Sequence, residues 1–413
     1  MIMAEQETRE SLLEPYRVLD LAEGGCLIAG KILGDLGADV IKIEPPGGSP
    51  SRNVGPFYKD TDHPEKSLFW FAYNTNKRGI TLDIETADGK ELFKRLVKSA
   101  DFVIESFEPG YMASLGLGYE ELERVNPGII MTSITPFGAS GPYARYKASD
   151  LTTWAMGGFM AITGEPGRPP VWIGFPQASL HGGAMAAAAS LIAHWHREMT
   201  GEGQHIDVSI QQCVTWCLAT APRYYEFLLR FLNLSNLPRM GAHQPLPHAL
   251  SPGLNYVFPC KDGAVYLILL GGSNPSYLNS TKQLVSYMDE NGMAPDWLKE
   301  FDWVNEYDAS KLTQDVIDRV QGVVTEFLMT KTKGELYDEA LKRGIHLAPL
   351  SNAKEVYENR QLQAREFWAQ VEHPELGQAI GYCGPFVKLS EGPLRIRRRP
   401  RSSASITWRS MGS

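Results

Sequence analysis

Short apolar runs alternate with amphipathic stretches along the first third of the chain. The runs have the length and the Val, Ile and Leu content of buried strands, and the stretches between them have helical spacing. The expected strands are 16–21, 40–43, 79–82, 102–104 and 129–134, and the expected helices are 26–36, 86–99 and 119–125. Strands that alternate with helices indicate βαβ units. This region is therefore predicted to form an α/β domain with a doubly wound parallel sheet.

The pattern changes in the second half of the chain. Two short apolar runs, 257–259 and 265–270, flank Lys261–Gly263, whose Asp-Gly pair is typical of a hairpin turn. Helical patterns follow, and 344–349 has the pattern of an extended segment after a helix. A chain of 413 residues also exceeds the size of one ordinary core. We therefore expect two or more domains.

Composition narrows the classes of function. The net charge of −8 argues against a nucleic-acid-binding protein, and no apolar stretch is long enough to span a membrane. The polar, acidic N-terminus is unlike a signal peptide. Five cysteines without CxxC spacing indicate reduced thiols and no metal site, so we expect a cytoplasmic protein. The one dense basic run, 395–401, is expected to be a solvated tail.

The α/β start lacks the fingerprint of a dinucleotide-binding protein. The first strand is followed by Glu23–Cys26 (EGGC), and the next glycine is Gly30. The GxGxxG spacing that lets a backbone approach a pyrophosphate is therefore not met. A doubly wound sheet is expected, but the use of NAD is not supported.

Eight segments, taken in order, resemble the class III coenzyme A transferases, the family of formyl-CoA transferase and carnitine CoA-transferase. They are 18–48, 74–86, 100–122, 137–150, 157–174, 200–211, 256–267 and 344–356, the last two more weakly. The resemblance implies a large Rossmann-like domain built from both ends of the chain and a small α+β domain between them. It also implies an interlocked, ring-like dimer. The expected division is 1–200 and 331–413 for the large domain, 201–225 for a connecting helix and 226–330 for the small domain.

The chemistry that the resemblance implies is covalent catalysis by an aspartate. In the family, its carboxylate attacks an acyl-CoA thioester and forms a mixed anhydride, which CoA thiolate converts to an aspartyl-CoA thioester. The acceptor acid repeats the exchange, so one difficult transfer is divided into easier steps. We therefore expect coenzyme A, as acyl-CoA, and a carboxylic acid as substrates, with no permanently bound cofactor.

The position of that aspartate holds serine in this chain. It lies fifteen residues after Gly164 and twenty-two before Gly201, and both counts give Ser179. A serine hydroxyl is largely protonated at neutral pH and needs an adjacent base before it can attack. His181 is two residues away, but Ser179 lacks the GxSxG motif of a hydrolase. Ser179 is therefore not expected to replace the aspartate as a nucleophile.

Asp150 is the alternative carboxylate. The resemblance puts it close to the family's CoA site, where it is a fallback candidate for the nucleophile. Its structural interpretation is an N-cap or a network carboxylate at the start of a helix over 151–156. Racemases of the family, such as α-methylacyl-CoA racemase, need an acid/base pair where this chain has Ser149 and Ser179, so racemisation is disfavoured.

The resemblance also locates the CoA site, where several family residues have changed. Pro45, Glu85 and Ser114 occupy positions that are basic in formyl-CoA transferase, and its flexible glycine loop should fall in 241–253. Loss of cations weakens the binding of a polyphosphate. The two apolar candidates that remain would flank an adenine ring or pack in the core, and the lysine would meet a phosphate. The candidate CoA-binding residues are Glu23, Gly24, Leu82, Phe107 and Lys147.

Three hypotheses stay open. The first is a non-catalytic subunit of a heteromeric family member, such as the succinyl-CoA:(R)-benzylsuccinate CoA-transferase of anaerobic toluene degradation. A homologous partner chain, interlocked with this one, would then carry the aspartate. The second is a self-sufficient homodimeric transferase that uses Asp150. The third is a non-enzymatic protein that binds CoA esters.

Overall fold

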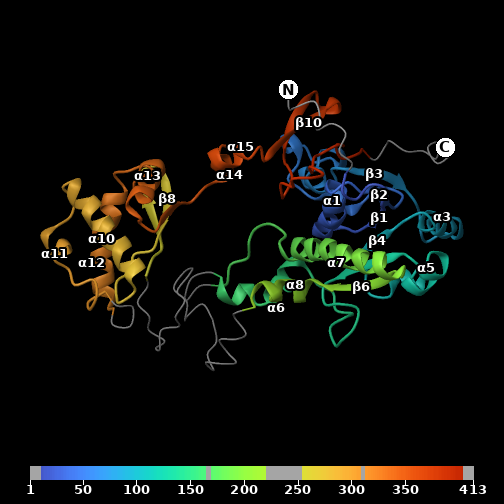
Figure 1. Cartoon of the computed structure of the whole chain (residues 1–413), viewed down its shortest axis with the longest axis horizontal. Coiled ribbons are helices and arrows are strands. Elements are labelled where there is room, and N and C mark those ends of the chain that lie inside the picture. The colour runs from blue at the N-terminus through green and yellow to red at the C-terminus, as the bar shows by residue number, and fades with distance from the viewer. Residues whose placement is uncertain (1–10, 164–168, 220–253, 308–311, 403–413) are drawn as a thin grey trace. The chain divides into compact units, whose positions relative to one another are not determined.

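The computed structural model of the chain describes residues 11–163, 169–219, 254–307 and 312–402. The chain forms two compact units, which are described separately (Figure 1). The first unit contains Met1–Phe159, Ile173–Leu218 and Asn359–Ser413, and the second contains Met160–Trp172 and Ala219–Glu358. The expected glycine loop at 241–253 lies outside the described residues.

A parallel sheet of six strands forms the centre of the first unit, with the order β3-β2-β1-β4-β5-β6. This is the order of a doubly wound Rossmann-like sheet, whose direction of winding reverses between β1 and β4. Every residue of β4 and β5 is buried, as expected for strands that are covered on both faces. The strands are β1 (Arg17–Leu21), β2 (Asp39–Glu44), β3 (Lys77–Thr81), β4 (Phe102–Glu105), β5 (Ile130–Thr135) and β6 (Gln204–Ser209).

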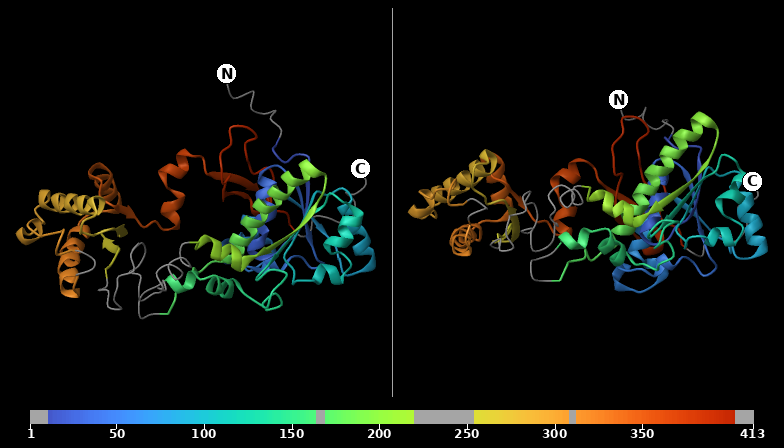
Figure 2. Two further views of the ribbon diagram at one scale, coloured as in Figure 1. Left: turned by 60° about the horizontal axis from the view of Figure 1, so that its bottom comes forward. Right: turned by 90° about the horizontal axis from the view of Figure 1, so that it is seen from below.

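Helices cover both faces of this sheet. On one face, α3 (Ala87–Val97) and α5 (Tyr119–Val125) pack on a core that includes Leu19 and Val103. On the other, α1 (Ile28–Asp35) and α7 (Ala178–Thr200) lie side by side (Figure 2). Helix α7 is rich in small residues, so its backbone approaches the sheet closely. The shorter elements are η2 (Gly24–Leu27), η3 (Pro50–Asn53), η4 (Tyr58–Asp60), η5 (Pro64–Lys66), α2 (Leu68–Tyr73), α4 (Tyr111–Ser114), α6 (Asp150–Met156) and η6 (Phe159–Ile162).

The range 201–225 was expected to be a connecting helix, and this expectation is wrong for its described part. That part contains β6, which pairs with β5, followed by the short helix α8 (Ile210–Cys217). Exposed and less exposed residues alternate along the first half of β6, which is the pattern of an edge strand. The alternation covers only a few residues, which is too short a pattern to identify a strand from the sequence.

The C-terminal part of the first unit packs beside β3. Strands β10 (Trp368–His373) and β11 (Gln378–Cys383) form a hairpin after α15 (Arg360–Ala364), with η7 (Pro374–Leu376) between them. The basic run 395–401 follows. Its arginine side chains are exposed, but its backbone is anchored, because the Asn76 amide donates to the Arg398 carbonyl at 2.9 Å. The description of this run as a solvated tail is therefore wrong for its backbone.

The second unit combines a small antiparallel sheet with helices. Strands β7 (Val257–Cys260) and β8 (Gly263–Leu267) form the expected Asp-Gly hairpin, and β9 (Leu347–Pro349) adds to β8. Because β9 belongs to this sheet, the chain returns to the first unit at Asn359 rather than at the expected residue 331. The helices are α10 (Pro275–Glu290), α11 (Asp296–Lys299), α12 (Gln314–Leu328), α13 (Lys333–Arg343) and α14 (Ala353–Tyr357). None of the described helices is both long enough and apolar enough to cross a membrane.

Candidate functional site

The fold itself indicates where a ligand would bind. In doubly wound sheets, ligands occupy the crevice at the carboxyl ends of the strands, where the winding reverses. Here that point lies between β1 and β4. The loops that follow these two strands are joined by a hydrogen bond of 2.9 Å from the Glu23 amide to Ser106 Oγ. The candidate residues Glu23, Gly24 and Phe107 therefore lie at this edge of the sheet.

Ser179 and Asp150 are brought together at the start of α7. Ser179 Oγ donates to Asp150 Oδ1 at 3.0 Å, and the Ser179 amide donates to the same oxygen at 2.9 Å. The second carboxylate oxygen accepts from the Gln177 amide at 2.9 Å. The N-cap residue of α7 makes no side-chain cap of its own, so Asp150 satisfies amides that would otherwise lack partners.

The expected role of Asp150 as the N-cap of its own helix needs a correction. Ser149 caps α6 through a capping box with Thr152, and Asp150 is the first helical residue. Its carboxylate instead serves the N-terminus of α7. This is the network interpretation of Asp150, and its partner could not be found from local pattern because Ser179 is 29 residues away.

The Ser179 hydroxyl is enclosed by backbone on its other side. A Cβ placed on Gly25 would lie 2.3 Å from Ser179 Oγ and 2.9 Å from the Leu180 amide nitrogen. Only glycine at this position lets η2 and α7 approach so closely. The crevice residue Gly24 is therefore adjacent in sequence to the glycine that touches the nucleophile position.

His181 does not form a dyad with Ser179. Its Nδ1 lies 2.7 Å from the Gln177 carbonyl, and because a carbonyl can only accept, Nδ1 carries the proton. The Ser179 hydroxyl donates to Asp150 instead. The arrangement therefore lacks the Ser–His pair that a serine hydrolase requires.

The other predicted CoA-binding residues occupy two kinds of environment. Leu82 and Phe107 follow β3 and β4 at the carboxyl edge, and both are partly buried against the core that carries α3 and α5. The Phe107 ring is 4.8 Å from that of Tyr111. Lys147 is exposed on the loop before α6. Packing thus accounts for much of the surface of Leu82 and Phe107, and their role in binding adenine stays a prediction.

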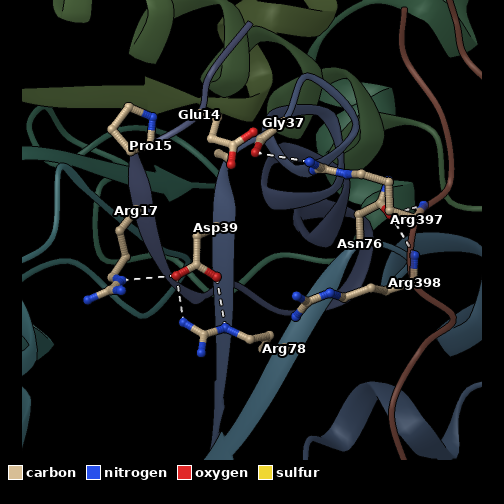
Figure 3. A pocket seen from close by; sticks show the side chains of 10 residues that line it. Glu14, Pro15, Arg17, Gly37, Asp39, Asn76, Arg78, Arg397 and Arg398 are labelled. Carbon is tan, nitrogen blue, oxygen red and sulfur yellow. Dashed lines mark hydrogen bonds and ion pairs between the residues drawn. The ribbon is translucent and has the colours of Figure 1, made fainter. Parts of the chain in front are cut away.

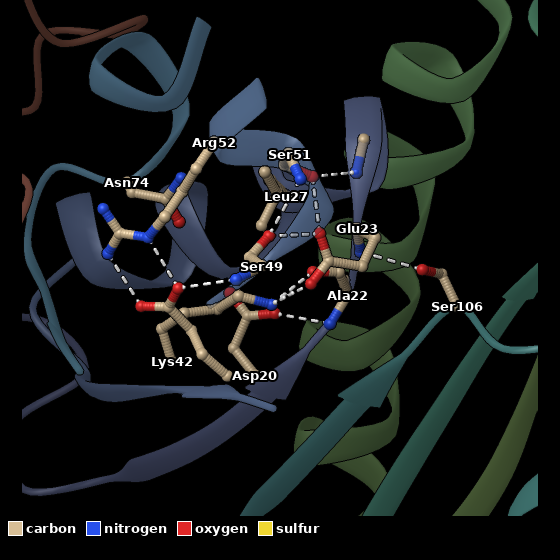
Figure 4. A network of polar contacts seen from close by, with 12 residues as sticks. Asp20, Ala22, Glu23, Leu27, Lys42, Ser49, Ser51, Arg52, Asn74 and Ser106 are labelled. Atoms are coloured by element: carbon tan, nitrogen blue, oxygen red, sulfur yellow. Dashed lines mark hydrogen bonds and ion pairs between the residues drawn. The ribbon is translucent and has the colours of Figure 1, made fainter. Parts of the chain in front are cut away.

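The carboxylate of Glu23 is already engaged. It faces Lys42, Ser49 and Ser51, which come from β2 and the loop that follows it (Figure 4). The Gly24 amide donates to Ser51 Oγ at 2.8 Å, which fixes the start of η2 against the same loop. The two residues that were predicted to contact CoA therefore form an internal polar network.

Glu105 is a site-edge residue that the sequence reasoning missed. Burial, together with the charge of Asp207, raises the pKa of Glu105 to about 7 despite hydrogen bonds from Ser133 and from the Phe107 amide. A carboxylate at the end of the apolar run FVIE was the available signal. Its Oε2 accepts a hydrogen bond of 2.6 Å from the Phe107 amide, which holds the start of the loop after β4.

We expect the wild-type protein to lose stability between about pH 5 and about pH 8, and the Glu105→Gln variant to lose less over the same range. The folded-state pKa lies above the ordinary value of 4.5, so the folded state binds the proton more tightly than the unfolded state. Stability from this group is complete below the unfolded pKa and is lost as the pH rises through about 7. The loss amounts to about 3 kcal/mol, and glutamine cannot undergo it. Urea unfolding at both pH values measures it.

Glu91→Gln, at an exposed position on α3, is the matched control and should keep the pH dependence of the wild type. His205 titrates with the opposite sign, because burial lowers its pKa, but it is present in all three proteins. Equal pH dependence of the Glu105 variant and the wild type would contradict the prediction.

A cavity of about 460 Å³ lies at the opposite, amino edge of the sheet (Figure 3). Arg17 and Arg78 both pair with Asp39 there, and Arg397 donates to the Gly34 carbonyl at 2.6 Å. The Arg397 bond ties the C-terminal segment to α1, and the two ion pairs join neighbouring strands. The cavity therefore belongs to the structural framework and lies at the opposite edge of the sheet from Ser179. No group of three metal-ligating side chains occurs among the described residues.

Comparison with known proteins decides the family. The profile of CoA-transferase family III matches residues 13–402. This chain belongs to CoA-transferase family III. Among similar proteins, the succinyl-CoA:(R)-benzylsuccinate CoA-transferase subunit BbsE of Thauera aromatica is 33% identical over 387 residues, which cover 94% of this chain and 90% of that protein. The succinate–glutarate CoA-transferase of Agrobacterium fabrum is 31% identical over 403 residues, 96% and 94% of the two chains.

A solved structure shows the same fold. The crystal structure of a CAIB/BAIF family protein from Brucella suis has a TM-score of 0.77 and 28% identity, and the match covers 95% of this chain and 96% of that one. The predicted family and the α/β fold class are thus confirmed. CoA-transferases use CoA thioesters as substrates, and several similar proteins are named for succinyl-CoA and a carboxylic acid.

Proposed function

We propose that this family III chain is the non-catalytic subunit of a heteromeric CoA-transferase. The observation that carries the proposal is the hydroxyl of Ser179 at the nucleophile position, hydrogen-bonded to Asp150. A hydroxyl paired with a carboxylate in this way cannot form the acyl anhydride on which the family's chemistry depends. A homologous partner chain that carries the aspartate would perform the transfer.

The proposal extends to the assembly and the substrates. The similarity to BbsE, which is named as a subunit, favours an interlocked heterodimer or a larger assembly. It also favours succinyl-CoA as the donor and an arylsuccinate as the acceptor acid. In this arrangement the chain completes the fold of its partner and shapes the pocket, and the complex works in the cytoplasm.

Asp150 supports a second candidate function, a self-sufficient transferase. Its carboxylate lies 3.0 Å from Ser179 Oγ, so it occupies nearly the same place as the missing aspartate. Against this, both of its oxygens accept hydrogen bonds from the N-terminus of α7. Those bonds stabilise the negative charge and reduce its nucleophilicity. A third candidate, a CoA-ester-binding protein without activity, would bind an acyl-CoA tightly in the absence of any partner.

The direct test is to purify the chain alone and together with a homologous chain that has aspartate at the nucleophile position, and then to measure CoA exchange. Activity only in the mixture supports the proposal. Full activity of the lone chain would refute it. Calorimetric titration of the lone chain with an acyl-CoA tests the third candidate in the same experiment.

We expect Asp150→Asn in the assembled complex to lower stability but to keep the transferase activity. The asparagine side chain lacks the negative charge that binds the backbone amides of α7. Its NH2 group also faces one of those N–H donors, at a cost of about 1–3 kcal/mol. Asp88→Asn, at an exposed position in the first turn of α3, is the control for stability. If activity falls by several orders of magnitude while the protein stays folded, Asp150 is the nucleophile and the second candidate is correct.

A further inference from the structure

Three hydrogen-bond donors surround the carboxylate of Glu23. Glu23 Oε1 is 3.2 Å from Lys42 Nζ, and Oε2 accepts from Ser49 Oγ and Ser51 Oγ, each at 2.5 Å (Figure 4). Lys42, Ser49 and Ser51 are each no more than 3% exposed. We call these three residues the anion cradle. Glu23 itself is 29% exposed through its side chain, so it is the solvent-facing member of this group.

Lys42 depends on Glu23 for its counter-charge. A buried ammonium without a partner is costly, because desolvation disfavours its charged form. The neighbouring buried carboxylates are already committed to other cations. Asp20 lies 2.8 Å from Lys77 Nζ, and Glu44 forms a bidentate pair with Arg52. Glu23 is therefore the carboxylate that faces Lys42 and is not paired with another cation.

The cradle is held in place by bonds that do not involve the Glu23 carboxylate. Lys42 Nζ donates to the Ala22 carbonyl at 2.5 Å. Ser51 Oγ accepts from the Gly24 amide at 2.8 Å, and Ser49 Oγ accepts from the Ser51 amide at 3.1 Å. An ammonium and two hydroxyls in fixed positions thus converge on the space that one carboxylate group fills. Such a set of donors matches a carboxylate or a phosphate.

We propose that Glu23 is a resident substitute for the oxyanion of a ligand, and that its removal opens the anion cradle to a small carboxylate or phosphate. The cradle lies beside the reversal point between β1 and β4, where ligands of doubly wound sheets bind. In the intact chain, the negative charge of Glu23 repels a second anion from this part of the crevice. Glu23 is therefore a specificity-determining residue of the crevice.

One consequence rests on the proposed function. If the chain is the non-catalytic subunit, Glu23 keeps anions out of the cradle and so weakens, without abolishing, the binding of an acyl-CoA or acid in its crevice, and the productive binding falls to the partner chain. The existence of the cradle does not depend on that function. A binding experiment on the isolated chain therefore tests the cradle separately from any measurement of transferase activity.

The experiment compares Glu23→Ala with the wild type by thermal unfolding in a buffer without phosphate or carboxylate. Inorganic phosphate, acetate and CoA are added in separate titrations. The variant should be stabilised by about 3–6 °C at roughly ten times the dissociation constant of the anion, and the wild type should not shift. Phosphate or CoA as the effective ligand identifies a phosphate site, and acetate identifies a carboxylate site.

Two further variants serve as controls. Glu23→Ala combined with Lys42→Met removes the ammonium and should abolish the shift, and Glu108→Ala removes an exposed carboxylate after β4 and should behave as the wild type. If Glu23→Ala does not fold in the anion-free buffer, its refolded yield with acetate or phosphate, relative to chloride, measures the same binding. The proposal is overturned if the variant responds no more than the wild type, or if the response survives loss of Lys42. Neither result would bear on whether the complex transfers CoA.

Discussion

Arg52→Met should lower the free energy of unfolding of the first unit by about 3–5 kcal/mol, because it leaves a buried carboxylate without its cation. The Arg52 side chain is only 2% exposed, and its Nε and a terminal nitrogen donate to the two oxygens of Glu44 at 2.7 and 2.8 Å. Its guanidinium lies 3.9 Å from the ring centre of Trp70 and donates to the Arg401 carbonyl at 3.0 Å. Methionine keeps the packing on Trp70 but none of these bonds.

The electrostatics of Glu44 explain the size of the effect. Burial alone would raise the pKa of Glu44, but the hydrogen bonds and charge of Arg52, together with the bond from the Ser49 amide and the charge of Lys42, lower that pKa. Without Arg52 the carboxylate of Glu44 is still buried but has lost its bidentate partner, so it either keeps a poorly compensated charge or takes up a proton. The Ser49 amide also donates to Glu44, so the loop that carries two residues of the anion cradle should loosen.

Urea unfolding at neutral pH measures the change. The double variant with Glu44→Leu should recover most of the loss, because an apolar pair of similar volume often replaces a buried ion pair without cost. Lys354→Met removes one member of an exposed pair with Glu358 and should cost at most about 1 kcal/mol. A similarly small effect of Arg52→Met would show that solvent reaches Glu44 freely.

The sequence predicted the central sheet well because its signal is local. The run 102–104 is a strand in the structure with one added residue, and 119–125 matches α5. Each buried strand must be apolar on both faces, so a few consecutive residues identify it. The edge strand β6 was missed because one of its faces is exposed, which leaves a weaker, alternating pattern.

The candidate site was predictable only in part, since its contacts join distant segments. Ser179 was found by counting residues from Gly164 and Gly201, and Asp150 from the family resemblance. Neither indicated that the two side chains share a hydrogen bond. Glu23 was predicted to contact CoA, but in the folded chain its carboxylate faces Lys42, so its charge is used internally. Such pairing depends on tertiary structure and leaves no periodic trace in the sequence.

Ser179→Asp should give the chain a covalent chemistry that the wild type lacks. The new carboxylate would lie in the first turn of α7, where the helix dipole favours a negative charge. Its oxygen can attack the carbonyl of an acyl-CoA thioester, whereupon the C–S bond breaks and CoA thiolate leaves from an acyl anhydride. Return of the thiolate to the side-chain carbonyl releases the acid and leaves an aspartyl-CoA thioester.

Incubation with an excess of succinyl-CoA, trapping with hydroxylamine and mass analysis of the peptides that contain residues 150 and 179 detect the product. A hydroxamate at the substituted position is expected in the variant, and no label at all in the wild type. Ser179→Asn, which has the same shape without the charge, should also remain unlabelled. A label on Asp150 in the wild type would contradict the prediction, because the carboxylate that holds the N-terminus of α7 would then be a working nucleophile. Equal labelling of the Asn variant would likewise show that the charge at this position is not what the chain lacks.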